Sequence, residues 1–371
     1  MAQGSVAQIT AVSSLSFSEL NPLLQPAPQA VLYLAQARTL QQPADEERLN
    51  DLLTQGRDQV DAGQIDAAIA TYEEAARLDP ENARIHSALG FLHARENNFE
   101  AAVAAYEQAV ALDANNADFY YALAFCRANL QDYAGAADAY RRTIQLRRND
   151  LEAYLGLGVV LSRSGDYDGA IAAYRQVLAN NPNNARLYES IGSAYLQQEQ
   201  YSEALEMFRK AATLDSRSST VQLNLGVALL NTGDVANGMA ALERAAALEP
   251  RNGTIQLQLG DVYRAQGNLP QAIAAYEKAA AIQPRLREAH LELGELYLEE
   301  QDYLRAIVAY RKLIELEPED ADAYYQLGVA LQGRERNREA QRAFEQARDL
   351  YAQQGNTEGV KKAAAAAEAV N

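Results

Sequence analysis

The chain of 371 residues carries 33 basic and 50 acidic side chains, which gives a formal net charge of −17 at pH 7. So acidic a surface is repelled by the phosphates of nucleic acid and of anionic membranes, and no apolar run approaches the ~18 residues of a membrane-spanning helix. These properties argue against nucleic-acid binding and membrane insertion, and they favour cations or cationic protein segments as partners.

Residues 1–48 are predicted to form a flexible tail followed by a capping helix. Residues 1–22 are rich in Ser, Ala and Gln and have no charge before Glu19, a composition typical of disorder. Apolar residues recur at helical spacing over residues 29–41, and Pro43 is expected to end that helix. The tail has neither a basic segment nor a clear apolar core, so no intact signal peptide is predicted.

From residue 49 the chain is built from one repeated unit, which is clearest in residues 151–182. Its first half has apolar or small side chains at i, i+3, i+4 and i+7, the spacing of one helical face: Tyr154, Leu157, Gly158 and Leu161. A Ser-Gly-Asp turn follows, and a second helix is predicted to end near Pro182. Its Tyr174 is expected to fill the space beside Gly158 and Ala170.

The Gly158 position recurs every 34 residues as Gly or Ala, and the Tyr174 position recurs as Tyr or Phe with one exception, Leu242. Nine such units fill residues 49–354, and they resemble the tetratricopeptide repeat (TPR) family, whose period is 34 residues. The resemblance implies an all-α fold, a TPR α-solenoid coiled into a right-handed superhelix whose concave groove is lined by the first helix of each repeat. Residues 355–371 are predicted to form a C-terminal capping helix, with Thr357 as its N-cap.

Motifs of catalysis are absent from the sequence, which contains no HExxH, GxxxxGK or GxSxG pattern. Cys126 is the only cysteine, so the chain forms no internal disulfide. His86 and His93 are seven residues apart and could share a metal ion, but their repeat positions are packing positions. We interpret both, and His290, as core-filling side chains. The chain is therefore predicted not to be an enzyme and to require no cofactor, and catalysis stays a remote alternative.

The TPR resemblance assigns groove-lining positions to each first helix, and the residues at these positions change in character along the chain. The first three repeats have basic and aromatic side chains there: Arg57, Arg84, Phe91, Arg95, Tyr121 and Phe125. The middle repeats have aliphatic ones: Leu155, Val159, Leu223, Val227 and Leu257. The later repeats have carboxylates: Asp261, Glu288, Glu292, Glu295 and Glu299. We expect a groove polarised in this order, which binds a peptide or helix of a partner protein through these residues.

Four of these carboxylates form the sharpest local pattern, because they follow one another at i, i+4, i+7 and i+11 on one helical face: Glu288, Glu292, Glu295 and Glu299. Like charges at this spacing destabilise a helix, and no Lys or Arg of that helix shares the face. Three interpretations stay open. The stripe binds Lys or Arg of a bound peptide, it holds a divalent metal such as Mn or Ca, or it is a solvated face of a very acidic protein.

Two known uses of the family are not matched by this chain. The carboxylate clamp for chaperone C-termini needs Asn directly after the repeat glycine, where no repeat has one, and the asparagine ladder of the sugar-transferase superhelix is matched by Asn224 alone. The leading hypothesis is therefore a non-enzymatic scaffold that binds a partner protein segment in the groove, such as an assembly factor for a larger complex.

The alternative hypothesis is a protein that binds and delivers a divalent metal. The nine repeats, the length and the acidic groove also resemble those of periplasmic assembly factors of photosystem II, which implies manganese delivery to a partner. That resemblance implies a periplasmic location, and without it we expect a cytoplasmic one.

Overall fold

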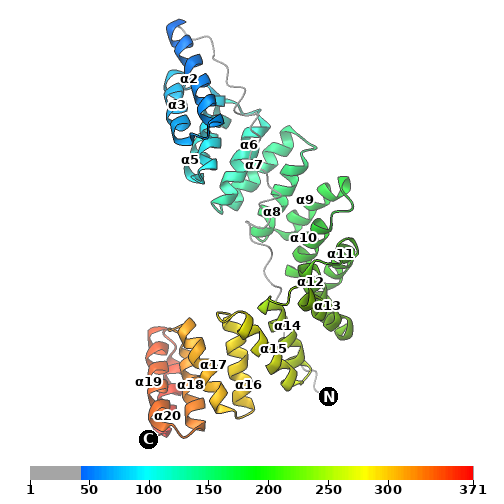
Figure 1. The fold of residues 1–371 in the computed structure, drawn as a ribbon, viewed down its shortest axis with the longest axis vertical. Coiled ribbons are helices and arrows are strands. Elements are labelled where there is room, and N and C mark those ends of the chain that lie inside the picture. The colour runs from blue at the N-terminus through cyan, green and yellow to red at the C-terminus, as the bar shows by residue number, and fades with distance from the viewer. Residues whose placement is uncertain (1–42, 371) are drawn as a thin grey trace. The chain divides into compact units, whose positions relative to one another are not determined.

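The computed structural model describes residues 43–370, which form helices α2 to α20 with no strand among them (Figure 1). The all-α prediction is confirmed for this part of the chain. The first helices of successive repeats are α2 (Pro43–Asp61), α4 (Ala83–Arg95), α6 (Ala117–Asn129), α8 (Leu151–Arg163), α10 (Ala185–Gln197), α12 (Ser219–Asn231), α14 (Gly253–Ala265), α16 (Arg287–Glu299) and α18 (Ala321–Gly333). The second helices are α3 (Ile65–Leu78), α5 (Phe99–Leu112), α7 (Tyr133–Leu146), α9 (Tyr167–Asn180), α11 (Tyr201–Leu214), α13 (Val235–Leu248), α15 (Leu269–Ile282), α17 (Tyr303–Leu316) and α19 (Asn337–Gln353), and α20 (Thr357–Ala369) follows them.

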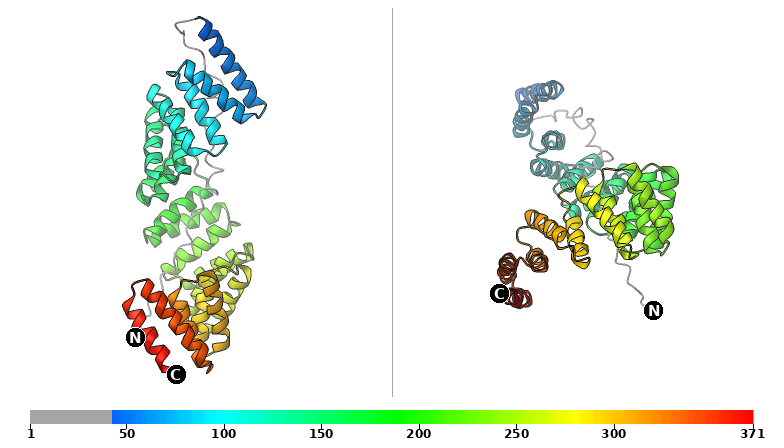
Figure 2. Two further views of the ribbon diagram at one scale, coloured as in Figure 1. Left: turned by 90° about the vertical axis from the view of Figure 1, so that its left-hand side faces the viewer. Right: turned by 60° about the horizontal axis from the view of Figure 1, so that its bottom comes forward.

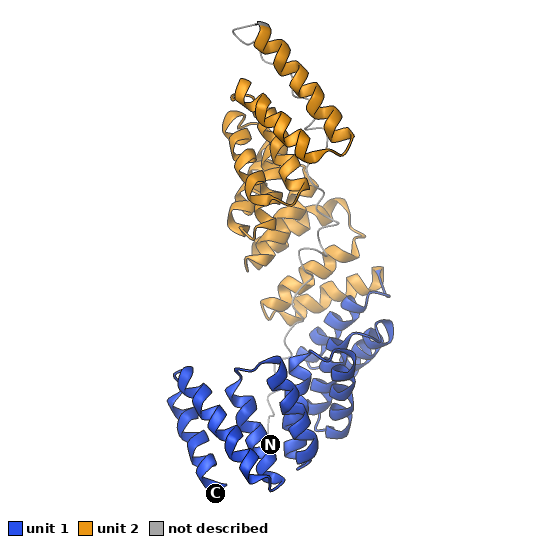
Figure 3. Ribbon diagram, turned by 60° about the vertical axis from the view of Figure 1, so that its left-hand side comes forward, with its two compact units in different colours: residues 1–10, 215–371 blue, residues 11–214 orange. Residues whose placement is uncertain are grey.

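The described residues fall into two compact units, which Figure 3 shows in separate colours. Residues 43–214 hold α2 to α11, and residues 215–370 hold α12 to α20. Within each unit every helix packs on the next one along the chain, so that helix pairs stack beside helix pairs (Figure 2). Such stacking gives each unit a core that extends from repeat to repeat.

The core of most repeats is a glycine on the first helix packed against an aromatic ring on the second. A Cβ added at Gly260 would lie 2.4 Å from Cε1 of Tyr276, and one added at Gly158 would lie 2.5 Å from Cε1 of Tyr174. The helices approach so closely because glycine has no side chain. The rings at the Tyr174 position are buried as predicted, and they include Tyr72, Tyr106, Tyr140, Phe208, Tyr276, Tyr310 and Phe344.

The sixth repeat closes the same space in another way. Leu242 stands where other repeats have a ring, and it is fully buried. Gly238 replaces the alanine usual on the second helix and faces Gly226 of α12, where an added Cβ would lie 3.1 Å from the Gly238 carbonyl oxygen. Because two glycines face each other, α12 and α13 approach closely and a smaller side chain fills the gap.

The turns within the repeats contain a residue with positive φ at one fixed repeat position. Glycine occupies this position at residues 63, 165, 233 and 267, where positive φ has no steric cost. Five other residues adopt φ values between 58° and 61° there: Asn97, Gln131, Glu199, Gln301 and Glu335. The second helix then starts at a capping side chain, as where Asp166 Oδ1 accepts a hydrogen bond of 2.9 Å from the Gly169 N–H.

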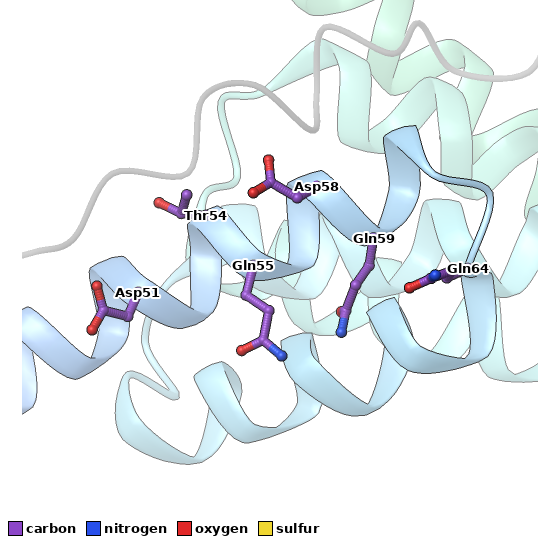
Figure 4. A pocket seen from close by; sticks show the side chains of 6 residues that line it. All are labelled: Asp51, Thr54, Gln55, Asp58, Gln59 and Gln64. Carbon is purple, nitrogen blue, oxygen red and sulfur yellow. The ribbon is translucent and has the colours of Figure 1, made fainter.

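Helix α2 begins at Pro43, earlier than residue 49, where the first repeat is predicted to start. Proline is tolerated at a first helical position because its missing N–H would have no helical partner there. The capping helix predicted over residues 29–41 lies outside the described residues. One face of α2 is polar, and Figure 4 shows the polar side chains that line a depression formed by α2 and the start of α3: Asp51, Thr54, Gln55, Asp58, Gln59 and Gln64.

The polar face of α2 differs from the matching face of the next repeat. Asp51 and Asp58 are exposed, whereas the residues at the same positions one repeat later, Ile85 and Leu92, are fully buried. An exposed carboxylate needs no apolar cover. The first repeat therefore has a hydrophilic end of its own.

At the other end, α20 packs on α19 and covers the last repeat. Ala363 is fully buried, and a Cβ added at Gly359 would lie 2.6 Å from Cδ1 of Tyr351. The helix is capped by Asn356, whose Oδ1 accepts a hydrogen bond of 2.9 Å from the Gly359 N–H. The expected cap, Thr357, is therefore wrong by one residue, because Thr357 already lies inside the helix.

Candidate functional site

The predicted carboxylates lie in one unit, on α14 and α16. Glu288 and Glu299 are exposed, whereas the side chains of Glu292 and Glu295 are partly buried, with 26% and 43% of their surface exposed. Asp261, on α14, is half-buried. We call these five residues the acidic face.

Arg264 neutralises part of the acidic face from the preceding repeat. Its guanidinium on α14 donates to the Glu292 carboxylate, and its Nη2 lies 2.9 Å from Oε2 of Glu295. Burial opposes the charge of Arg264, but the hydrogen bonds and charges of Glu295 and Glu292 raise its pKa above the usual range. The sequence of α16 alone could not show this pairing, because the cation belongs to α14 of the preceding repeat.

Asp261 lies next to this ion-pair cluster in a less solvated place. The Tyr276 hydroxyl donates to its Oδ1 at 2.8 Å, and Gln258 Nε2 lies 3.3 Å from its Oδ2. Burial raises the pKa of Asp261 from 3.8 to about 6, and the charge of Glu292 adds to the rise, while Tyr276 and Arg264 act in the opposite direction. Burial dominates because a carboxylate loses solvation when it is removed from water.

The raised pKa of Asp261 predicts a pH dependence of stability. The folded protein binds this proton more tightly than the unfolded chain, so the contribution of Asp261 to the free energy of unfolding is fully present below about pH 4 and is lost as the pH rises through about 6. After allowance for partial exposure, the loss is about 1 to 2 kcal/mol. The Asp261→Asn variant should not show this pH-dependent loss of stability, because the asparagine side chain does not titrate.

Urea unfolding of both proteins at about pH 4 and about pH 8 measures this effect. The free energy of unfolding of Asp261→Asn relative to the wild type should increase by about 1 to 2 kcal/mol between the two values. A constant difference across this range would show that Asp261 titrates at its ordinary pKa.

Two buried polar atoms near the acidic face have no hydrogen-bond partner among the described residues. They are Oε1 of Gln258 and the hydroxyl of Tyr310, and both side chains are at least nine-tenths buried. A Cβ added at Gly294, the residue before Glu295, would lie 2.7 Å from Cζ of Tyr310, so this hydroxyl lies beside α16. An unpaired buried donor or acceptor costs free energy, so each atom is an unused hydrogen-bonding group beside the carboxylates.

The predicted basic and aromatic section lies in the other unit, and the structure buries most of its rings. Phe91, Tyr121 and Phe125 are no more than 8% exposed. Tyr121 packs edge-on against Tyr140 with ring centroids 5.6 Å apart. Arg84 and Arg95 are exposed, and Arg57 is half-buried. The rings are thus core side chains in this structure.

The predicted aliphatic section is buried as well. Val159, Leu223, Val227 and Leu257 are no more than 8% exposed, and Leu155 is half-buried. Leu155 and Val159 belong to one unit, and the other three residues belong to the other unit. The polarised groove through all nine repeats therefore stays a prediction.

The histidines considered as metal ligands are held by loop carbonyls. His86 Nε2 lies 2.9 Å from the Pro80 carbonyl oxygen, and His290 Nε2 lies 3.0 Å from that of Pro284, at the same repeat positions. Both rings, and that of His93, are half-buried rather than enclosed, so the core-filling prediction overstated their burial. Between residues 43 and 370 no group of three or more His, Cys, Asp or Glu is arranged to hold a metal ion.

Family models of the repeat match most of the chain. The model described as tetratricopeptide repeat matches residues 53–117, 88–150, 127–185, 155–219 and 189–253, and the model described as TPR repeat matches residues 260–301 and 294–333. The chain belongs to the tetratricopeptide repeat family. No curated protein matches this TPR chain. In its described part, no helix combines the length and the hydropathy needed to cross a membrane.

Solved TPR structures are similar to the chain. The C-terminal part of a TPR repeat-containing protein from Cytophaga hutchinsonii is 19% identical, covers 66% of this chain and 99% of its own, and has a TM-score of 0.52. A MamA protein is 31% identical over 46% of this chain and 94% of its own, with a TM-score of 0.41. YrrB, described as a TPR protein with an unusual peptide-binding site, is 21% identical over 50% of this chain and 96% of its own, with a TM-score of 0.42.

The specific resemblance to PratA, the photosystem II assembly factor suggested by repeat number, length and acidic groove, receives no support from these comparisons. The comparisons support the TPR family and its fold. They do not support the metal cargo or the compartment that PratA would imply.

Proposed function

We propose that this TPR protein is a non-enzymatic scaffold whose acidic face binds a basic segment of a partner protein. The observation that carries the proposal is the charge imbalance of the acidic face, where Arg264 is the one guanidinium among the described residues that pairs with any of its five carboxylates. The other arginine of these two helices, Arg287, pairs with Glu317 and Asp320 instead. Proteins of this family bind protein partners, and a scaffold of this kind is suited to hold a subunit while a larger complex assembles.

The exposed ends of the acidic face are the points at which a partner cation would bind. Glu288 and Glu299 form no salt bridge with any described residue, so Lys or Arg of a bound segment can approach them without displacing Arg264. Each exposed pair contributes about 0.2 to 1 kcal/mol, so several pairs and further contacts are needed for useful affinity. Electrostatic pairs also fix the direction and register of the bound segment.

No observation favours the metal-delivery alternative. Arg264 already occupies Glu292 and Glu295, the central carboxylates of the stripe on α16. A divalent cation there would have to displace a guanidinium that makes charge-assisted hydrogen bonds to both.

Two peptides of opposite charge test the proposed function. In the first, lysine and leucine alternate (the Lys–Leu probe), and in the second, glutamate replaces lysine (the Glu–Leu probe). Fluorescence anisotropy should show binding of the Lys–Leu probe alone, and its affinity should fall at least tenfold between about 0.05 M and about 0.5 M salt. Equal binding of both probes, or no effect of salt, would exclude charge recognition.

A further inference from the structure

Helix α17 carries two large apolar side chains on its outer surface. Leu304 is 59% exposed and Val308 is 64% exposed. The next most exposed large apolar side chain in the described residues is that of Leu214, at 42%. Leu304 and Val308 are one helical turn apart and therefore share a face. A single exposed leucine is ordinary, but an adjacent pair so far out of the core is a candidate contact surface.

The neighbouring second helices extend this surface. The positions of Leu304 and Val308 hold the exposed Pro270 and Ala274 one repeat earlier on α15, and the exposed Arg338 and Arg342 one repeat later on α19. We call these six residues the outer patch.

Two ion pairs show that the three helices lie side by side. Arg305 Nη1 on α17 is 3.4 Å from Oε1 of Glu277 on α15, and Arg311 Nη2 on α17 is 3.3 Å from Oε2 of Glu339 on α19. The outer patch is therefore one surface, apolar over α15 and α17 and basic over α19.

The outer patch is positively charged, whereas the same two repeat positions in the first five repeats, and the chain as a whole, are negatively charged. Each of the first five repeats has an acidic residue at one of the two positions: Asp66, Glu100, Asp138, Asp168 and Glu206. In a chain of net charge −17, Arg338 and Arg342 are exposed cations that form no salt bridge with any residue between 43 and 370. They supply a fixed positive border to an apolar surface.

We infer that the outer patch is a second docking surface, which binds an acidic amphipathic helix of a partner protein. The apolar side of that helix would cover Leu304 and Val308, and its carboxylates would pair with Arg338 and Arg342 as charge-assisted hydrogen bonds. The net charge of the chain repels any anionic partner, but a membrane would present its charge to the whole chain, whereas a single helix would meet only the outer patch. This surface lies on the second helices, whereas the acidic face lies on the first, so neither proposal depends on the other.

The test uses the full chain and two labelled helical peptides with leucine on one side. The acidic probe has glutamate on the other side, and the basic probe has lysine. The wild type should bind the acidic probe, and binding of the basic probe should not change with either pair of substitutions in the outer patch. Leu304→Ser with Val308→Ser, and separately Arg338→Glu with Arg342→Glu, should each weaken binding of the acidic probe at least tenfold.

A matched control is Leu112→Ser with Leu130→Ser, which removes two exposed apolar side chains of the other unit and should leave binding unchanged. All substituted residues are on the surface, so melting curves should match that of the wild type. Unchanged binding of the acidic probe by the Arg338→Glu, Arg342→Glu variant would overturn the proposal. Self-association of the wild type that the Leu304→Ser, Val308→Ser variant abolishes would also overturn it, because a second copy would then be the occupant.

Discussion

Replacing both Glu292 and Glu295 by lysine is expected to weaken binding of the Lys–Leu probe by about a hundredfold or more. The change reverses two charges of the acidic face and leaves Arg264 beside two ammonium groups instead of two carboxylates. Like charges across an interface cost several kcal/mol, so an incoming lysine is repelled where it was attracted. Fluorescence anisotropy at low salt measures the change in affinity.

This double substitution also removes both ion pairs of Arg264, so loss of folding has to be separated from loss of binding. Adding Arg264→Glu to it restores two oppositely charged pairs with reversed polarity. The triple variant should therefore melt close to the wild type and still bind the probe weakly. Recovery of binding in the triple variant would show that folding, rather than the charge of the acidic face, had been lost.

A charge-matched control completes the experiment. Glu73→Lys with Glu100→Lys makes the same change in net charge at exposed positions of the other unit. The control should alter the affinity less than about twofold, because neither residue belongs to the acidic face and neither would form an ion pair with the bound probe. A loss equal to that of the Glu292 and Glu295 variant would mean that net charge alone governs binding.

The second large effect concerns stability. Tyr276→Ala is expected to lower the free energy of unfolding by about 3 to 5 kcal/mol. The ring is fully buried against Gly260, and its hydroxyl is the donor closest to Asp261, so the substitution leaves a cavity and an unpaired, half-buried carboxylate. Because each repeat is stabilised by its neighbours, the repeats of α14 to α17 should unfold at lower urea concentration than the rest of the chain.

Tyr276→Phe separates the two causes, because it keeps the ring and removes only the hydroxyl. It should cost about 1 to 1.5 kcal/mol, and it should raise the pKa of Asp261 further by removing a hydrogen bond to the carboxylate. Urea unfolding above and below pH 6 measures both effects. A loss of less than about 1 kcal/mol in Tyr276→Ala would show that the ring position is not a core position.

The repeat core could be predicted from the sequence because its contacts lie at fixed spacing within one helix pair. Gly158 and Tyr174 are sixteen residues apart and meet in every copy that keeps the turn length, so their recurrence alone identified buried positions. The start of α2 and the N-cap of α20 differ from the predicted residues. Helix α2 starts at Pro43, before the predicted start of the repeats at residue 49, and the α20 cap is Asn356 instead of Thr357. Sequence patterns define the ends of a helix only to within about one or two residues.

The candidate site could be predicted only in part, because its partners come from different repeats. The stripe on α16 was evident from helical spacing, but its counter-ion Arg264 belongs to α14, and the pairing depends on how one repeat is rotated against the next. For the same reason, side chains assigned to the groove, such as Phe125 and Val227, are buried here. Position in a repeat predicts which way a residue points, whereas its exposure depends on the neighbours that cover it.

The most direct test of the central claim, that the acidic face binds a basic segment, is residue-resolved hydrogen exchange of the full chain with and without the Lys–Leu probe. The account predicts that exchange slows in residues 253–299, which hold α14 to α16, and that the Glu292→Lys, Glu295→Lys variant shows no such change. Slowing confined to residues 43–214, or equal slowing in the variant, would contradict it.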